Sequence, residues 1–251
     1  MPGAPANYDG VDKEVTMANT SLTSAGPPAS IRPAVSVLAL RGSRAGGIEV
    51  FVQHRRKSMD FAAGVVAYPG GRVDPVDFAR GAADSRCPVA QEHARLWGRA
   101  VDLSFGPGSA GHQPGQDAAL PAAVLLAAAL RELEEETGAS AAPEACVPWD
   151  VWTTPPGYPR RFDTFFYALD ASDLQLQNTT TEASVGRWSS TGNLLEQFYA
   201  GDIRLWRPTY TLLRSVHELG DPSEISAGRR IVPDRPDSSA PDDAHHRKYG
   251  L

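Results

Sequence analysis

One helix with an acidic face constrains this chain more than any other feature. Residues 122–130 (AAVLLAAAL) are strong helix formers, and the run continues as RELEEETG over 131–138. Residues at i, i+3 and i+4 share one helix face, so Glu132, Glu135 and Glu136 should lie together. Such carboxylates repel one another in water but are good oxygen ligands for Mg²⁺ or Mn²⁺. The alternative is a solvated acidic helix end, partly balanced by Arg131.

A second informative segment lies upstream, where YPGGRVDP over 68–75 predicts a strand that ends in a Gly70-Gly71 turn. Glycine lets a backbone approach a ligand or metal because no Cβ is in the way. Together the two segments resemble the signature of the Nudix hydrolases, G-x5-E-x7-R-E-U-x-E-E-x-G-U, where U is aliphatic. Ala139 replaces the last aliphatic residue, and the early glutamate of the pattern falls at Asp77.

The signature is interrupted in this chain. Arg131 follows Gly71 by 60 positions (131 − 71), whereas the uninterrupted pattern allows 14, so about 46 residues are inserted. Because the insertion joins the glycine turn to the acidic helix, we expect it to cap or shape the pocket. Its deletion should then alter substrate preference more than stability.

The resemblance implies a fold and a reaction. The fold is an α/β (α+β) sandwich, with helices packed on a mixed sheet. The reaction is attack of water on a pyrophosphate bond in a nucleoside diphosphate derivative, assisted by Mg²⁺ or Mn²⁺. It assigns Glu132, Glu135 and Glu136 as metal ligands, together with a main-chain carbonyl near Gly70 or Gly71. Arg131 would pair with a carboxylate of the signature and fix the helix against the loop.

The general base has three candidates. Glu182 lies six residues before Trp188, and family members often carry a glutamate at about that distance before a tryptophan. Glu132 could serve instead, and Asp163 is a third option. A solvated loop position is the alternative interpretation of Glu182.

The segment before the glycine turn narrows the substrate. Arg55 precedes Gly64 by nine residues, a spacing similar to that of the coenzyme A diphosphatases of the Nudix family. The interrupted signature resembles the branch, typified by one such diphosphatase, in which a long insertion splits the signature. Ala62 stands where that motif commonly has histidine, and Tyr68 replaces a phenylalanine. The resemblance predicts coenzyme A or an acyl-coenzyme A as substrate. The candidate phosphate-binding residues are Arg55, Arg56, Arg160 and Arg161, each of which could instead be solvated.

Two other functions stay open. An ADP-ribose or dinucleotide pyrophosphatase would carry a proline or tyrosine some 15 to 20 residues past the signature, and Pro155, Pro156 and Tyr158 fall there. A non-catalytic, nucleotide-sensing regulator with this fold is the second. Such proteins usually lose carboxylates of the signature, whereas all three glutamates remain here.

Composition limits the partners. The net charge is −6, which argues against nucleic-acid binding and leaves a small-molecule nucleotide as the expected partner. Two cysteines cannot form a four-cysteine zinc site or a disulfide framework, so we expect a cytoplasmic protein. No apolar run approaches the roughly 20 residues of a membrane span. Many Nudix proteins are dimers, so the resemblance allows a homodimer.

The chain should contain one domain between two tails. We expect a disordered tail over 1–30, a domain over 31–230 with its insertion at about 78–116, and a flexible tail over 231–251. Strands are predicted at 34–40, 48–54, 65–68, 162–169 and 183–188, and the first two should be antiparallel. Helices are predicted at 90–101, 117–137, 191–200 and 207–219.

Overall fold

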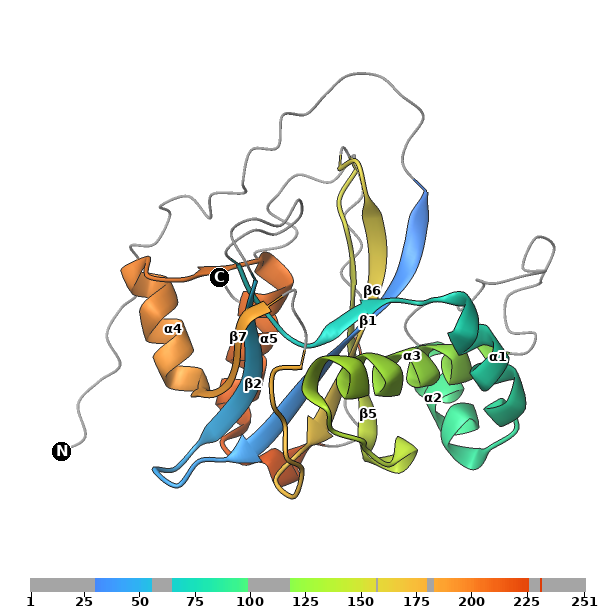
Figure 1. The fold of residues 1–251 in the computed structure, drawn as a ribbon, viewed down its shortest axis with the longest axis horizontal. Coiled ribbons are helices and arrows are strands. Elements are labelled where there is room, and N and C mark those ends of the chain that lie inside the picture. Colours follow the sequence, from blue (N-terminus) through green and yellow to red (C-terminus); the bar gives the residue numbers. More distant parts are fainter. Residues whose placement is uncertain are drawn as a thin grey trace.

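The structure is a computed structural model that describes residues 30–55, 65–98, 118–156, 158–179, 183–225 and 231. Eight strands form one mixed sheet: β1 (Ile31–Gly42), β2 (Ile48–Arg55), β3 (Val65–Ala67), β4 (Gly70–Arg72), β5 (Cys146–Thr153), β6 (Arg161–Asp170), β7 (Ala183–Ser190) and β8 (Arg204–Leu205). The α-helices of the described segments are α1 (Pro75–Asp84), α2 (Pro88–Gly98), α3 (Ala119–Thr137), α4 (Thr191–Ala200) and α5 (Arg207–Leu219), shown in Figure 1. None of these helices combines the length and apolar character that a membrane-spanning segment needs.

The long strand β1 organises the sheet. The strand order is β5-β6-β1-β2-β3-β8, with β4 also paired to β1 and β7 also paired to β2. β1 and β2 form the predicted antiparallel pair, whereas β1 and β6 are parallel. The other end of β1 pairs with β4, in a register that sets Ser36 opposite Gly70. This pairing holds the glycine turn against the sheet.

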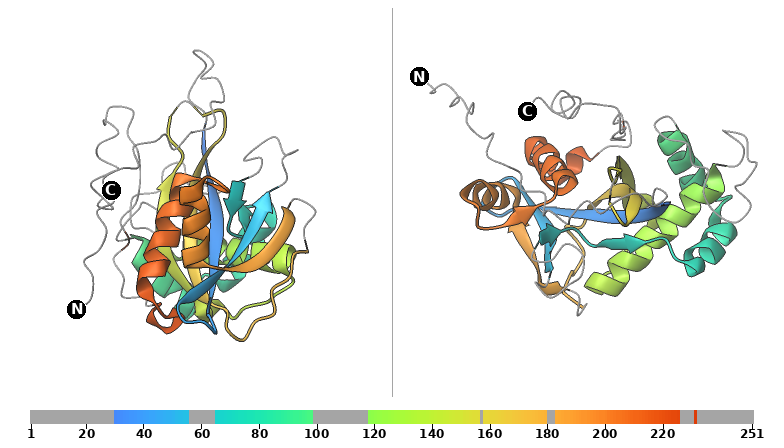
Figure 2. Two further views of the ribbon diagram at one scale, coloured as in Figure 1. Left: turned by 90° about the vertical axis from the view of Figure 1, so that its left-hand side faces the viewer. Right: turned by 90° about the horizontal axis from the view of Figure 1, so that it is seen from above.

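Helices cover both faces of the sheet, as the views in Figure 2 show. Alternate residues of β1 point to opposite faces: Val35 and Val37 enter the core beneath α2 and α3, and Leu38 and Leu40 enter the core beneath α4 and α5. These two cores confirm the predicted α/β sandwich with a mixed sheet. Ile231, the first residue of the predicted C-terminal tail, is buried in the first core.

The described part of the insertion belongs to the first core, which corrects the expectation that it mainly affects substrate preference. Trp97 of α2 is fully buried and packs edge-on against Phe165 and Tyr167 of β6, with ring centroids 5.2 and 5.5 Å apart. Its Nε1–H donates to the Tyr167 hydroxyl at 3.3 Å. Removing α2 would therefore expose core side chains. Residues 99–117, which complete the insertion, lie outside the described residues.

The predicted helices and strands are present, with ends shifted by a few residues, but several elements were not predicted. Strand β5 contains Pro148, which removes a ladder hydrogen bond; the strand tolerates it at the sheet edge, where the register shifts between Pro148 and Asp150. Helix α1 was also not predicted, although Pro75 lies in its first turn, where proline is favourable. β4 and β8 have three and two residues, too short to show a periodic pattern.

Candidate active site

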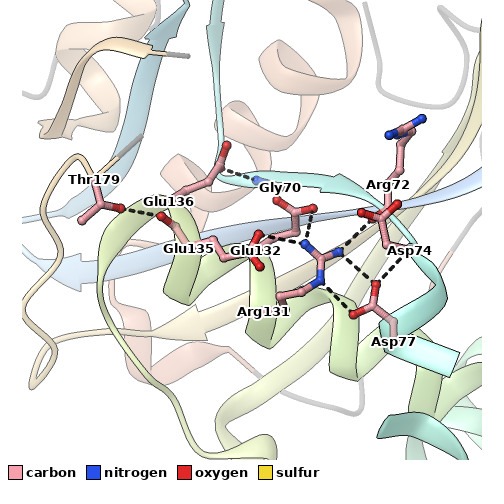
Figure 3. Close-up of polar contacts among 9 residues, drawn as sticks. All are labelled: Gly70, Arg72, Asp74, Asp77, Arg131, Glu132, Glu135, Glu136 and Thr179. Atoms are coloured by element: carbon pink, nitrogen blue, oxygen red, sulfur yellow. Dashed lines mark hydrogen bonds and ion pairs between the residues drawn. The ribbon is translucent and has the colours of Figure 1, made fainter. Parts of the chain in front are cut away.

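Arg131 is the centre of a polar cluster between α1, α3 and β4 (Figure 3). Its Nε donates to Asp77 Oδ1 and its Nη2 to Asp77 Oδ2, each at 2.9 Å. Its Nη1 donates to Glu132 Oε1 at 2.9 Å and to Glu135 Oε2 at 3.0 Å. Only 7% of the Arg131 side chain is exposed, and Asp77 is fully buried. One guanidinium therefore gathers carboxylates from two helices.

The first turn of α1 positions Asp77. The backbone N–H of Asp74 donates to Asp77 Oδ2 at 2.8 Å, so the carboxylate that binds Arg131 also satisfies a donor at the start of α1. Arg131 Nη2 additionally donates to the Arg72 carbonyl at 3.0 Å. The guanidinium thus binds the strand and both helices at once.

Glu136 binds the glycine turn. Its Oε2 accepts a hydrogen bond from the Gly70 N–H at 2.9 Å, which joins the end of α3 to β4. Gly70 has a φ of 154°, and a Cβ there would lie 2.7 Å from Ser36 Cα and collide with the Val35 carbonyl. A Cβ on Gly71 would lie 2.6 Å from Glu132 Cδ. A side chain at position 70 would collide with the backbone of β1, whereas one at position 71 would displace the Glu132 carboxylate.

The C-terminal end of α3 is fixed by a loop that follows β6. Gly138 ends the helix with a φ of 70°, and its N–H donates to the Glu134 carbonyl at 2.8 Å. Thr179 donates from its N–H to the Glu136 carbonyl at 3.1 Å and from its Oγ1 to the Glu135 carbonyl at 2.6 Å. The backbone that carries both glutamates is therefore held from outside the helix.

The electrostatics of the cluster are set by burial and by mutual charge. Burial raises the pKa of Glu132, and the nearby charges of Glu135 and Asp74 raise it further, whereas Arg131 opposes the shift. The hydrogen bond to Asp77 raises the pKa of Arg131, so this residue stays cationic at any physiological pH. The two glutamates that bind Arg131 Nη1 differ in their exposure to solvent: 13% of the Glu132 side chain is exposed, against 59% for Glu135.

The predicted metal ligands lie at the same end of α3, but their carboxylates are engaged in different ways. Glu132 and Glu135 converge on one nitrogen of Arg131, whereas Glu136 is directed to the Gly70 N–H. Within the described segments, no three acidic, histidine or cysteine side chains form a group that could hold a metal ion. The donors themselves are hard oxygens of the type that Mg²⁺ and Mn²⁺ prefer.

The other predicted site residues are spread over the chain. Arg161 begins β6, and its Nε donates to the Thr154 carbonyl at 3.0 Å, while Arg160 is exposed in the preceding bend. Asp163 accepts a hydrogen bond from the Thr153 hydroxyl. Arg55 is the last residue of β2, but its side chain is not described. Arg56 and Glu182 lie outside the described residues, so their roles stay predictions.

Two residues that influence the glutamates of the candidate site were not predicted from the sequence. Asp74 contributes negative charge to Glu132, and Thr179 supports the glutamates through the α3 backbone. Asp74 carried a signal, since an acidic residue directly before a proline is typical of a helix start. Thr179 carried none, because its contacts depend on where the loop after β6 packs.

Comparisons with known proteins extend the description of the fold. No protein-family model matches the chain, and no curated protein matches its sequence. Among solved structures, a NUDIX hydrolase from Alicyclobacillus acidocaldarius has 22% identity and a TM-score of 0.56, over 80% of this chain and 99% of that one. A MutT protein from Methanosarcina mazei Go1 has 15% identity and a TM-score of 0.42, over 77% and 97% of the two chains. The likeness to the first of these shows that the chain has the fold of a Nudix hydrolase.

Proposed function

We propose that this protein is a metal-dependent hydrolase that cleaves the pyrophosphate bond of a nucleoside diphosphate derivative. The observation that carries the proposal is the convergence of Glu132 and Glu135 on one Arg131 nitrogen, beside a glycine that leaves no room for a side chain. A surface ion pair would not need a buried arginine held by two helices and a strand. The arrangement instead keeps acidic side chains together at an open position.

Glu132, Glu135 and Glu136 would hold Mg²⁺ or Mn²⁺. The bound metal would neutralise phosphate oxygens and lower the pKa of a bound water. Glu135 is the most accessible of the carboxylates bound to Arg131, so its carboxylate can exchange the guanidinium for a metal at least cost. Arg131 would then keep its two bonds to Asp77 and hold α3 in place. The general base stays open between Glu132, Asp163 and Glu182.

Coenzyme A or an acyl-coenzyme A is the substrate we propose to test first. The support is the Arg55-to-Gly64 spacing in the sequence, with Arg55, Arg56, Arg160 and Arg161 as candidate phosphate-binding residues. Arg160 is exposed and available for such a contact. ADP-ribose and dinucleotides are the competing substrates. We propose that the reaction takes place in the cytoplasm.

The decisive experiment assays a panel of nucleoside diphosphate derivatives with Mg²⁺ or Mn²⁺, using wild type and Glu135→Gln. Glu134→Gln is the matched control, because Glu134 is the preceding residue of the same helix, is exposed, and accepts a hydrogen bond from the Ser140 hydroxyl. We expect Glu135→Gln to lower kcat at least about 100-fold with little change in melting temperature. Glu134→Gln should keep wild-type activity.

Other outcomes would contradict specific parts of the proposal. Full activity in Glu135→Gln would remove this residue from the mechanism. Nucleotide binding without any hydrolysis by wild type, with either metal, would favour the sensing regulator instead.

A further inference from the structure

Gln53 of β2 carries an unexplained polar group. Only 3% of this residue is exposed, and its Nε2 is buried without a hydrogen-bond partner in the described structure. Almost all buried polar groups in folded proteins are paired, and an unpaired amide is disfavoured relative to an apolar side chain of similar size. Because the described residues offer this amide no partner, a bound ligand is a candidate for that role.

The pairing of β2 places Gln53 on the α3 side of the sheet. Its cross-strand partners are Ala67 of β3 and Gly186 of β7, and residues that pair directly point to the same face. A Cβ on Gly186 would lie 3.1 Å from Phe51 Cζ, and Phe51 belongs to the core beneath α3. Gln53 shares the face of Phe51, two residues away on the same strand.

This face adjoins the carboxylate cluster from two directions. Ala67 precedes Gly70 by three residues, and the Gly70 N–H binds Glu136. On the other side, a Cβ on Gly186 would lie 2.9 Å from Asn178 Cβ. Asn178 directly precedes Thr179, which binds the Glu135 and Glu136 carbonyls. Gln53 thus lies between the glycine turn and the loop that supports the glutamates.

The neighbours of Gln53 on this face are small. Ala67 and Gly186 are both only partly buried, so a flat group could approach the sheet there. The combination of a buried donor with small, accessible neighbours is typical of the polar groups that orient a ligand in an otherwise apolar site.

We propose that Gln53 is a substrate-binding residue whose amide donates a hydrogen bond to a carbonyl oxygen of the group attached to the diphosphate. That carbonyl belongs either to a nucleobase or to an amide-containing arm such as that of coenzyme A. The inference rests on the proposed function for the position of the diphosphate at the carboxylates. It adds a determinant of which diphosphate derivative is accepted.

The test measures binding rather than turnover. Uridine monophosphate carries base carbonyls, phosphopantetheine carries arm amides, and adenosine monophosphate has no carbonyl. None of the three contains a pyrophosphate bond, so each can be titrated calorimetrically with Mg²⁺ present. The proteins are wild type, Gln53→Leu and the control Gln91→Leu, which removes an exposed glutamine from α2.

We expect Gln53→Leu to weaken binding of one carbonyl ligand about tenfold, and to leave adenosine monophosphate unchanged. The ligand affected identifies the base or the arm as the source. The melting temperature of the free protein should not fall, because the variant loses an unpaired amide. Gln91→Leu should bind all three ligands like wild type.

Four results would overturn the inference: an equal loss for all three ligands, unchanged binding of all three, no binding of either carbonyl ligand by wild type, or a lower melting temperature in Gln53→Leu. The last would show that the amide has a structural partner. Wild-type binding that depends on Gln53, without pyrophosphate hydrolysis, would support this inference and reject the proposed function.

Discussion

Asp77 and Arg131 lie 54 residues apart in sequence, yet they form an ion pair with two parallel hydrogen bonds of 2.9 Å. Asp77 belongs to the first turn of α1 and Arg131 to α3, so the pair joins the start of the insertion to the acidic helix. The uninterrupted family pattern has a longer side chain at this point. Here α1 carries the shorter aspartate close enough for both of its oxygens to bind.

Removing Asp77 should destabilise the fold. Asp77→Ala leaves a nearly buried guanidinium without its bidentate partner, and breaking such a pair costs about 3–5 kcal/mol. Glu132 and Glu135 still contact Arg131, which favours the lower end of that range. Urea unfolding measures the loss. The control Glu218→Gln breaks an exposed pair with Arg214 and should have no measurable effect; an equal loss in both variants would contradict the argument.

Substitution by alanine should affect the stability of the fold differently at two glycines of the insertion. A Cβ on Gly81 of α1 would lie 2.7 Å from the backbone N of Val124, so Gly81→Ala must push α1 away from α3 and should cost about 1–3 kcal/mol. Gly98 has nothing within 4 Å of the corresponding position, so Gly98→Ala should be neutral or stabilise α2 slightly. Thermal unfolding of the two variants decides; a harmless Gly81→Ala would show that the helices are not in close contact.

Helix α2 should contribute to stability through Trp97. Replacing this buried residue with alanine removes its contacts with Phe165 and Tyr167 and should cost about 3–5 kcal/mol. Val76→Ala in α1 is the control, because Val76 is exposed and surface changes usually stay within about 0.5 kcal/mol. Denaturant unfolding tests both. Wild-type stability in Trp97→Ala would favour the expectation that the insertion affects substrate preference more than stability.

His93 should make the fold sensitive to acid. Burial lowers the pKa of His93 to about 4, although a hydrogen bond to the Cys146 backbone and the charge of Glu92 oppose the shift. The unfolded chain takes up this proton below about pH 6.5, the folded one only near pH 4. The contribution of His93 to stability is therefore nearly constant above about pH 6.5 and falls as the pH decreases towards 4.

The expected size of this loss is about 2 kcal/mol between pH 7 and pH 5. His93→Gln should remove most of the difference between urea unfolding curves at these two pH values. His217→Gln, which changes an exposed histidine of α5, should retain it. A difference that persists in His93→Gln would assign the acid sensitivity to other groups.

Features that depend on local sequence could be predicted, and features that depend on packing could not. The helix over 119–137 follows from its residue types, and the grouping of Glu132 with Glu135 follows from helical spacing. By contrast, Glu136 turns towards Gly70 because β4 pairs with β1, which no local pattern indicates. The buried amide of Gln53 also depends on which strands flank β2. In the sequence of β2 alone, Gln53 is one of the polar residues of an alternating strand, and nothing marks it as buried.

The two glycines of the turn allow a final test, because their missing side chains would meet different neighbours. A Cβ on Gly70 would meet the backbone of Val35 and Ser36, which cannot move without disturbing β1. Gly70→Ala should therefore lower the melting temperature and the yield of folded protein. The three atoms nearest to a Cβ on Gly71 all belong to the carboxyl group of Glu132, which can rotate away.

Gly71→Ala should therefore fold nearly as well as wild type but hold Glu132 away from Arg131. Under the proposed function, its hydrolysis of the best pyrophosphate substrate should fall at least about tenfold, because the metal would lose one ligand. Melting curves and kcat, measured on both variants with saturating Mg²⁺, separate the two effects. A Gly71→Ala protein with full activity would mean that Glu132 is not a metal ligand, whereas a Gly70→Ala protein of unchanged stability would mean that β4 does not pair with β1 as the structure has it.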